Sequence, residues 1–526
     1  MSERIVTQSQ MRALEKRIMD EVGLESPILM ERAAMAARSA IEALGIENKT
    51  AMVFCGPGNN GGDGLALARM LTEAGWECAC FLLADPEKCS GENKRQQRIL
   101  ERLFGPSYLR AWPPAAGQQA EVYVDALFGI GQNRGLSGIY REAAAFLNAA
   151  KGRKVALDIP SGIHADTGIA LADQDGERVY VRADLTVTFG CRKSGLMLSQ
   201  GKAAAGRIVL DSCGIAYPDT TDVSSVEGVK GSLPDREDLE EILQRDPLGN
   251  KGSFGKVVLW AGGQRATGAA LLCTRSCFAA GAGYVKLLSY EDNRQLVLGQ
   301  VPETVFLDLK APGKKDMLLR AAEFADVIAM GCGVGIGEDA AGTLEDLCRA
   351  LSDLESWDAN KLPVLILDAD VLTILSAQPE LWEKLKALPV TTVMTPHMIE
   401  FSRLCKLPLE EIAKDRLSIA MAFAKEHQTI LVLKDAGTLI ASPDGRFSIS
   451  PYGNDGMAVA GSGDSLLGIL AAVMGRKKDP FGSVVCGVFL HGMAGDQAAD
   501  TVGRASMLPT DLTGQIGAAL SQILTD

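Results

Sequence analysis

The segment Ala460-Gly461-Ser462-Gly463-Asp464 contains residues that can bind a phosphate and remove a proton beside it. Glycines on both sides of a serine leave backbone N–H groups free to face an anion, and a helix predicted from Ser465 to Met474 adds its positive end. Asp464 falls in the first turn of that helix, where the helix dipole is expected to keep its pKa low. The pattern predicts an anion hole beside a general base, although a capped helix start gives the same residues.

Four polar clusters in the first half of the chain each follow a predicted buried strand. The strands are expected at residues 51–55, 121–124, 154–157 and 185–189, and the clusters are GPGNNGGDG from Gly56, DALFGIGQNRG from Asp125, DIPSG from Asp158 and CRKSG from Cys191. The carboxyl ends of parallel strands share one edge of a sheet, so the clusters are expected to meet in one crevice.

The clusters offer several kinds of chemistry to that crevice. Glycine-rich loops ahead of helices supply N–H donors for phosphates. Asn60, Asp125 and Ser161 offer oxygens to a cation of low charge density, while Asp158 and Lys193 form a candidate acid–base pair. Any one of these clusters is also compatible with a simple turn, so the prediction depends on all four together.

The second half repeats the arrangement of strands followed by polar clusters. Strands are predicted at 256–260, 327–330, 364–367, 393–394 and 430–433, and the clusters after four of them are GCGVG from Gly331, DAD from Asp368, TPH from Thr395 and KDAGT from Lys434. A lone histidine after a strand is more often structural, but His397 follows Thr-Pro and precedes Glu400, which favours a functional role. Lys434 can neutralise phosphate charge, or it can be a solvated lysine at a strand end. The set is interpreted as a nucleotide and acceptor site.

The length and the alternation of strands and helices indicate two α/β domains. A chain of 526 residues is too long for one hydrophobic core. Alternating elements predict parallel sheets covered by helices on both faces, which is a three-layer α/β/α architecture. Residues 211–233 have little apolar periodicity and are interpreted as a linker, so domains are expected at 1–219 and 220–526.

Composition limits the partners and the cellular compartment. The net charge of −13 argues against nucleic-acid binding, and no apolar run is long enough to span a bilayer. The 12 cysteines are scattered, and the charged N-terminus lacks a secretory leader. We therefore expect a cytoplasmic protein with no membrane or nucleic-acid partner. A homo-oligomer is also expected, although composition does not bear on it.

Residues 1–215 resemble the NAD(P)H-hydrate epimerases through GPGNNGGDG, VDALFGIG, LDIPSG and FGCRKSG. In that family the substrate is a reduced nicotinamide cofactor that has added water at C6, and the enzyme interconverts its R and S epimers. The resemblance implies a Rossmann-like domain in which Asp158 acts at the ring with Lys193 as its partner, and Asn60, Asp125 and Ser161 hold potassium. The implied substrate-binding residues are Asn59, Asn60, Gly61, Gly62, Asp63, Gly129, Ile130, Gly131, Gln132, Asn133, Arg134, Gly135 and Asp158.

Residues 240–520 resemble the ribokinase-like superfamily and, within it, the NAD(P)H-hydrate dehydratases, through NKGSFGKVV, ATGAA, DAD, TPH, KDAGT and GNDGMAVAGSGD. Members use ADP or ATP to phosphorylate the S hydrate and then lose phosphate, which restores NADH or NADPH. The domain order implies ADP as the donor, with release of AMP and phosphate, and Glu400 matches an acidic position near magnesium-bound phosphates. Asp464 is the implied base. Ala269, Gly333, His397 and Asp464 are expected to line the substrate pocket, and the implied nucleotide-binding residues are Lys434, Asp435, Ala436, Gly437, Thr438, Gly461, Ser462 and Gly463.

The chain departs from the dehydratase pattern, and two other functions stay open. Cys332 stands where proline is usual, Met398-Ile399 replaces Pro-Gly, and Ala266 stands where an aromatic residue is common. These changes affect the expected pocket shape and rate more than the reaction type. One alternative is a vitamin or sugar kinase with a non-catalytic N-terminal binding domain, and the other is an N-terminal scaffold.

Overall fold

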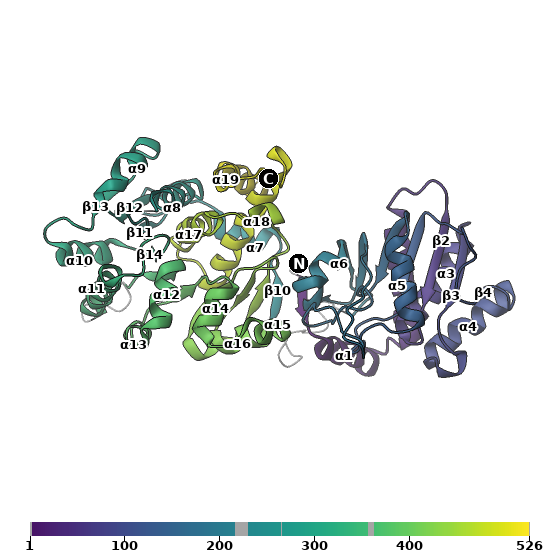
Figure 1. The fold of residues 1–526 in the computed structure, drawn as a ribbon. Coiled ribbons are helices and arrows are strands. Elements are labelled where there is room, and N and C mark those ends of the chain that lie inside the picture. The colour runs from purple at the N-terminus through teal and green to yellow at the C-terminus, as the bar shows by residue number, and fades with distance from the viewer. Residues whose placement is uncertain (1–2, 216–229, 265, 356–361, 525–526) are drawn as a thin grey trace. The chain divides into compact units, whose positions relative to one another are not determined.

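The computed structural model describes residues 3–215, 230–264, 266–355 and 362–524, and it divides the chain into two compact units, Glu3–Gly231 and Ser232–Asp526 (Figure 1). Each unit contains a largely parallel sheet covered by helices, so the predicted α/β class is confirmed. The domain boundary predicted near residue 220 falls on residues 216–229, which lie outside the described residues. The division into 1–219 and 220–526 therefore stays a prediction.

The N-terminal unit is built on a seven-stranded parallel sheet. In spatial order its strands are β4 (Leu109–Arg110), β3 (Glu77–Leu82), β2 (Thr50–Cys55), β5 (Val122–Ala126), β6 (Arg153–Leu157), β7 (Leu185–Phe189) and β9 (Arg207–Asp211). Outside this seven-stranded sheet, β1 (Glu3–Val6) pairs in parallel with β8 (Arg192–Lys193). The helices are α1 (Gln8–Arg17), η1 (Ile18–Val22), α2 (Ser26–Glu42), α3 (Asn59–Glu73), η2 (Pro86–Lys88), α4 (Gly91–Phe104), α5 (Ile139–Ala149), η3 (Ser194–Leu196) and α6 (Ser199–Ala205).

Alternate residues of each strand pack into two different cores. Val53 and Cys55 of β2 pack with apolar residues of α1 to α4, whereas Met52 and Phe54 pack with α5. This alternation follows from the two-residue period of a strand and confirms the three-layer arrangement of this unit. The strand order reverses between β2 and β5, which places the expected ligand crevice at their carboxyl ends.

Helix α3 begins earlier than the sequence predicted. The GPGNNGGDG cluster was expected to be a glycine-rich loop ahead of a helix, but Asn59 to Gly64 already form the first turns of α3. Gly61 permits this start because glycine has no Cβ. In any other residue the Cβ would lie 1.9 Å from the Gly56 carbonyl oxygen. The glycines therefore bring the helix against the preceding turn.

The C-terminal unit contains a sheet that is parallel from β13 to β17 and antiparallel from β17 to β19. In spatial order the strands are β13 (Val305–Asp308), β12 (Tyr284–Ser289), β11 (Lys256–Trp260), β14 (Val327–Met330), β15 (Val364–Leu367), β16 (Thr392–Met394), β17 (Thr429–Leu433), β18 (Leu439–Ala441) and β19 (Phe447–Ile449). The short strand β10 (Gly231–Leu233) lies where the chain divides into its two units. The order reverses between β11 and β14, which marks a second switch point.

Helices cover both faces of this second sheet (Figure 1). One face carries α8 (Thr267–Ala279), α17 (Ser462–Met474), α18 (Pro480–Val502) and α19 (Pro509–Leu524), with α7 (Arg236–Leu243) against α18 and α19. The remaining helices are η5 (Glu291–Asn293), α9 (Arg294–Gln300), α10 (Lys314–Phe324), α11 (Glu338–Glu355), α12 (Ala369–Ala377), α13 (Pro379–Lys386), α14 (Met398–Cys405), α15 (Leu409–Lys414), α16 (Arg416–His427) and η7 (Asp455–Met457). Helix α17 starts at Ser462, one turn before the predicted start, because Gly461 takes a φ of +104°.

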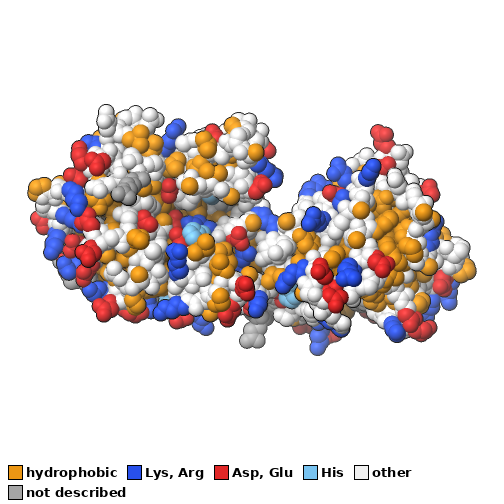
Figure 2. All heavy atoms as spheres, viewed as in Figure 1, with side chains coloured by type: hydrophobic (Ala, Val, Ile, Leu, Met, Phe, Trp, Pro, Cys, Tyr) orange, Lys and Arg blue, Asp and Glu red, His pale blue; other side chains and the backbone are white. Residues whose placement is uncertain are grey.

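Charged side chains of both signs are interspersed over the visible face of each unit (Figure 2). Within the part of the chain that the structure describes, every helix is too short or too polar to cross a bilayer.

Candidate functional site

A cavity of about 450 Å³ opens at the carboxyl edge of the N-terminal sheet. It brings together most of the residues predicted for this site. The predicted residues that line it are Asn59, Asn60, Asp63, Gly129, Ile130, Gly131, Gln132, Asp158 and Lys193. The four clusters predicted to share one sheet edge therefore contribute to one cavity or to the residues directly behind it.

Asp158 and Lys193 form a buried ion pair inside this cavity. Lys193 Nζ donates hydrogen bonds to Asp158 Oδ1, to Thr188 Oγ1 at 3.1 Å and to the Phe189 carbonyl at 2.6 Å. The Lys193 side chain is 1% exposed and that of Asp158 is 13% exposed, so the carboxylate is the member open to the cavity. Asp158 has a φ of +67°, in the left-handed region that aspartate and asparagine tolerate better than other non-glycine residues but still at a cost, as is typical of residues held in place for function.

Two further carboxyl groups face the same cavity. Burial, followed by the negative charge of Asp158, raises the pKa of Asp63 well above its ordinary value and raises that of Glu15. The cavity therefore contains two carboxyl groups whose pKa values are raised, beside Asp158, which pairs with a lysine. Asp63 was predicted, whereas Glu15 and Arg12 of α1 were missed because α1 reads from sequence only as an amphipathic helix.

Asp125 and Ser161 contact each other behind the cavity. Asp125 accepts hydrogen bonds from Ser161 Oγ at 2.7 Å, Ser161 N at 2.8 Å and Leu127 N at 3.2 Å. Burial raises the pKa of Asp125 to about 6, against the lowering effect of these three donors. Asn60 is also buried, and neither its Oδ1 nor its Nδ2 has a hydrogen-bond partner among the described residues.

Asn60 and Asp125 each offer a buried oxygen that a cation would stabilise. Asn60 and Asp158 both border Gly129. A Cβ at Gly129 would lie 3.3 Å from an atom of each of these two side chains. A buried amide oxygen without a partner and a buried carboxylate without a basic neighbour both become more favourable next to a positive ion.

The remaining predicted epimerase residues line a neighbouring cavity of about 510 Å³. Asn133, Arg134 and Gly135 face this second cavity, and Gly131 and Gln132 line both. Gln132 fixes the turn, since its Nε2 donates to the Arg134 carbonyl at 2.8 Å and its Oε1 accepts from Gly162 N at 2.8 Å. Gly61 and Gly62 are buried in the start of α3. The predicted substrate segment thus spans two adjacent cavities.

In the C-terminal unit Asp464 lies in the first turn of α17, beside the switch point between β11 and β14. The low pKa predicted for this carboxyl is wrong. Burial and the negative charge of Asp368 raise the pKa of Asp464, although the Cys332 thiol and the Lys434 ammonium oppose that rise. Burial outweighs the helix dipole here, because the carboxyl group is removed from water.

Lys434 pairs with Asp368 directly beside the start of α17. Lys434 Nζ donates to Asp368 Oδ1 at 2.6 Å, and the Asp368 side chain is 2% exposed. A Cβ at Gly463 would lie 3.4 Å from Lys434 Nζ, so the lysine reaches the predicted anion hole. Although burial lowers the pKa of Lys434, the charge and hydrogen bond of Asp368 raise it overall, which keeps the ammonium group protonated.

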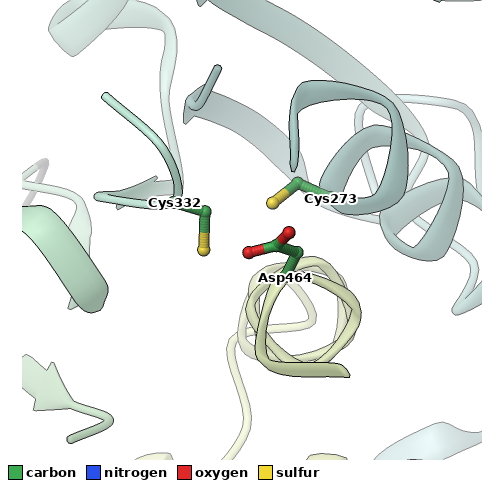
Figure 3. Close-up of side chains that lie close together, drawn as sticks. All are labelled: Cys273, Cys332 and Asp464. Carbon is green, nitrogen blue, oxygen red and sulfur yellow. The ribbon is translucent and has the colours of Figure 1, made fainter. Parts of the chain in front are cut away.

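Two buried thiols lie close to Asp464 (Figure 3). Cys273 of α8, Cys332 after β14 and Asp464 place their Sγ and carboxylate oxygen atoms within 4.8 Å of one another. Cys332 Sγ also donates to Asp368 Oδ2 at 3.7 Å. Sequence reasoning identified Cys332 only as a departure from a family pattern and missed Cys273.

His397 and Glu400 cap helix α14. His397 Nδ1 accepts hydrogen bonds from Ile399 N at 3.1 Å and Glu400 N at 3.3 Å, and Glu400 Oε2 accepts from His397 N at 2.9 Å. Glu400 Oε1 lies 3.4 Å from His397 Nε2. Both oxygens of Glu400 therefore contact His397, and the expected role of Glu400 near magnesium-bound phosphates stays a prediction.

The other predicted dehydratase residues lie at two places. Gly333 has a φ of +66° and lies against Ala269. A Cβ at Gly333 would lie 3.2 Å from the Ala269 Cβ. In the turn after β17, Asp435 pairs with Arg416 at 2.8 Å, and Thr438 Oγ1 donates to the Asp435 carbonyl at 3.3 Å. Ala436 and Gly437 lie in the same turn.

His491 of α18 supports the start of α17 and was not predicted. Its Nε2 lies 3.0 Å from the Ser462 carbonyl oxygen, and burial lowers the pKa of its imidazole to about 4. The ring is therefore neutral at physiological pH. A histidine in the middle of an apolar helix gives no sequence signal for this contact.

Comparisons with known proteins match both units. The model of the NAD(P)H-hydrate dehydratase family matches residues 257–517, and that of the YjeF-related protein N-terminus matches residues 26–195. The chain is 35% identical over 532 residues to the bifunctional NAD(P)H-hydrate repair enzyme Nnr of Thermofilum pendens, with 98% of this chain and 96% of the relative covered. The protein of the same name from Escherichia coli K12 is 30% identical over 517 residues, with 97% and 93% covered.

A solved structure matches part of the chain. The ribokinase-like superfamily protein EF1790 from Enterococcus faecalis V583 is 27% identical, with a TM-score of 0.50. The match covers 57% of this chain and 98% of the Enterococcus protein.

Proposed function

Because this chain belongs to the family of bifunctional NAD(P)H-hydrate repair enzymes, we propose that it restores hydrated NADH and NADPH to the intact cofactors. The family expected from the sequence motifs is confirmed, and the match over nearly the whole chain disfavours a vitamin or sugar kinase with an added binding domain. The observation that supports two activities is that each unit places an accessible aspartate, Asp158 or Asp464, at the carboxyl edge of its sheet.

In the N-terminal unit, Asp158 acts as the base at C6 of the hydrated ring. Lys193 holds the Asp158 carboxylate toward the cavity through their ion pair, and the strained backbone fixes the same direction. Backbone N–H groups at the start of α3 and in the Gly129–Gly135 turn bind the phosphates of the substrate. Asn60, Asp125 and Ser161 are the residues that would hold potassium, which would supply positive charge beside this cavity.

In the C-terminal unit, Asp464 removes the proton from the C6 hydroxyl of the S hydrate as this oxygen attacks the terminal phosphate of ADP. The N–H groups of Gly461 to Gly463 and the Lys434 ammonium stabilise the phosphoryl group that is transferred, and AMP leaves. Loss of phosphate from C6 and of a proton from C5 then restores the double bond of the reduced nicotinamide. Magnesium bound to the nucleotide phosphates neutralises their charge, and no step is assigned to Glu400.

The raised pKa of Asp464 suits this role. A base whose pKa lies closer to the working pH accepts a proton more readily than an ordinary carboxylate. Burial is the main cause of the raised pKa, and the negative charge of Asp368 adds to it while the positive charge of Lys434 opposes it.

The decisive test uses the purified full chain with a mixture of R and S hydrates, ADP and Mg²⁺. We expect recovery of the reduced nicotinamide absorbance from both epimers, with release of AMP and orthophosphate. Asp158→Ala should stop recovery at the S fraction, and Asp464→Asn should abolish recovery while the epimers still interconvert. A stable phosphorylated product would instead support a kinase, and unchanged kinetics in Asp158→Ala would support a scaffold.

The donor, the location and the assembly are further predictions of this proposal. Replacing ADP by ATP in the same assay tests the donor preference. Fractionation of cells tests the cytoplasmic location, and light scattering of the purified chain tests the expected homo-oligomer.

A further inference from the structure

We propose that Cys273, Cys332 and Asp464 form a binding site for a thiophilic divalent cation such as Zn²⁺, at the base proposed for the dehydratase reaction (Figure 3). Their three donor atoms lie within 4.8 Å of one another, and they are the only group of this kind among the described residues. Soft sulfur donors select Zn²⁺ and related ions over Mg²⁺, which prefers oxygen. The site is therefore distinct from any magnesium that accompanies the nucleotide.

Three elements that are distant in sequence supply the donors. Cys273 lies on α8, Cys332 follows β14, and Asp464 lies in the first turn of α17. The three side chains point toward one another between these elements (Figure 3). Helix α17 packs directly against α8 and β14, so the donors are held by packed elements and not by exposed turns.

The separation of the donors suits tetrahedral coordination after a small adjustment. With zinc–sulfur distances of about 2.3 Å and zinc–oxygen distances of about 2.0–2.2 Å, tetrahedral donors lie about 3.5–3.8 Å apart. Side-chain rotations that move the donor atoms by about 1 Å bring them from within 4.8 Å of one another to tetrahedral separations. Three protein donors leave a fourth position for water or for a substrate oxygen, as in zinc sites that are not purely structural.

The surroundings favour a cation once both thiols ionise. Cys273 and Cys332 are buried, whereas Asp464 is only partly buried, so an ion can enter from the Asp464 side. Binding displaces one proton from each thiol, and the two thiolates and the carboxylate outweigh the ion by one negative charge. Lys434 and Asp368 neutralise each other beside the site, so this single negative charge remains, and the Cys332 proton that points to Asp368 Oδ2 is one of the two that are released.

The expected consequence is selective inhibition, and this part depends on the proposed role of Asp464. A bound cation occupies the carboxylate that removes the hydroxyl proton, so the dehydratase reaction stops. The N-terminal unit has its own cavity and its own base, and epimerisation by the same chain continues.

Binding is tested on the reduced, metal-free full chain with Co²⁺ as a spectroscopic probe and Zn²⁺ as its competitor. We expect a thiolate-to-cobalt charge-transfer band that saturates at one ion per chain and is displaced by Zn²⁺. Cys332→Ser, Cys273→Ala and Asp464→Asn should each weaken binding at least tenfold. Cys277→Ala is the matched control, because Cys277 is a buried thiol of the same helix outside the cluster, and it should bind as the unaltered chain does.

The proposal is overturned if the unaltered chain shows no such band, or if the band persists at the same affinity in Cys332→Ser and Cys273→Ala. Inhibition is measured separately, as the ratio of dehydratase rates with and without Zn²⁺ in the unaltered chain and in Cys332→Ser. Binding with the expected dependence on both cysteines but without inhibition would leave the metal site standing and refute Asp464 as the base. This second result therefore separates the two proposals.

Discussion

The surroundings of Asp158 and Asp464 have opposite electrostatic effects on the two carboxyl groups. Asp158 contacts a lysine that is almost fully buried, while the ionisation of Asp464 is opposed by burial and by the negative charges of Asp368 and Asp370. The first arrangement stabilises a carboxylate in a fixed direction, and the second raises the proton affinity of the carboxyl group. Both arrangements depend on neighbours that are distant in sequence.

Replacement of Lys193 tests the first arrangement. Lys193→Met leaves Asp158 without its charged partner, so we expect the free energy of unfolding to fall by about 3–5 kcal/mol and epimerisation to slow by about 10²–10⁴-fold. Urea denaturation and the interconversion of R and S hydrates measure the two effects. Lys154→Met, at a partly exposed pair with Asp184, is the control and should change both quantities much less.

A second substitution separates stability from chemistry. Lys193→Met combined with Asp158→Asn removes both charges and keeps a residue type that tolerates the positive φ at 158. We expect this double variant to regain most of the lost stability while epimerisation stays slow. Recovery of activity along with stability would contradict the role of Asp158 as the base.

The burial of Asp125 predicts competition between protons and potassium. The pKa of about 6 for this carboxyl means that the folded protein holds its proton at pH values where an unfolded chain has lost it. The contribution of Asp125 to the free energy of unfolding therefore decreases as pH rises from about 4 to 6, because the ionised form is disfavoured by burial. Potassium should restore this stability above pH 6, where Asp125 is ionised.

Potassium activation of epimerisation measures this competition. The half-saturating potassium concentration should rise about tenfold for each pH unit below 6 and be constant above it. Asp125→Asn should weaken potassium activation and remove its dependence on pH. A half-saturating concentration that stays constant between pH 5 and 7 in the unaltered chain would contradict the assignment of Asp125 as a ligand.

At the scale of elements, the start of α3 depends on the close approach of its first turn to the Gly56 carbonyl. Gly61→Ala places a Cβ 1.9 Å from that oxygen and 2.8 Å from Asn93 Nδ2. Alanine in a helix usually stabilises by about 1 kcal/mol relative to glycine, but here we expect a loss of about 1–3 kcal/mol. The KM for the hydrate should rise as well, because Asn59, Asn60 and Asp63 share this turn.

Gly58→Ala is the matched comparison at the same helix start. A Cβ at Gly58 would meet no atom within 4 Å. We therefore expect its free energy of unfolding to change far less than that of Gly61→Ala. Equal losses in the two variants would show that the contact with Gly56 does not determine the start of α3.

At the scale of the whole molecule, two units with separate cores predict two separable unfolding transitions. Potassium should raise the midpoint of the transition of unit Glu3–Gly231, and ADP with Mg²⁺ should raise that of unit Ser232–Asp526. A ligand at about 100 times its Kd stabilises by about 2.7 kcal/mol. Calorimetry of the full chain with each ligand measures both shifts, and Asp125→Asn should remove the potassium shift alone. Movement of both transitions with either ligand would contradict independent sites.

The sequence alone determined the strands and the polar clusters that follow them. A buried parallel strand is a run of apolar residues, and its end is marked by glycine and polar residues, so both signals are local. The expected convergence of Asn60, Gly129 and Asp158 on one cavity followed from this pattern, because the carboxyl ends of parallel strands share an edge.

Only the tertiary structure decided the electrostatics and the supporting residues of each site. Glu15 enters the first cavity because α1 folds against it, and Cys273 reaches Asp464 because α8 packs against α17. The pKa of Asp464 was predicted in the wrong direction because its helix position is visible in the sequence, whereas its burial is not. Periodicity and motifs are properties of neighbouring residues, but burial and charge pairing arise between segments that meet only in the folded chain.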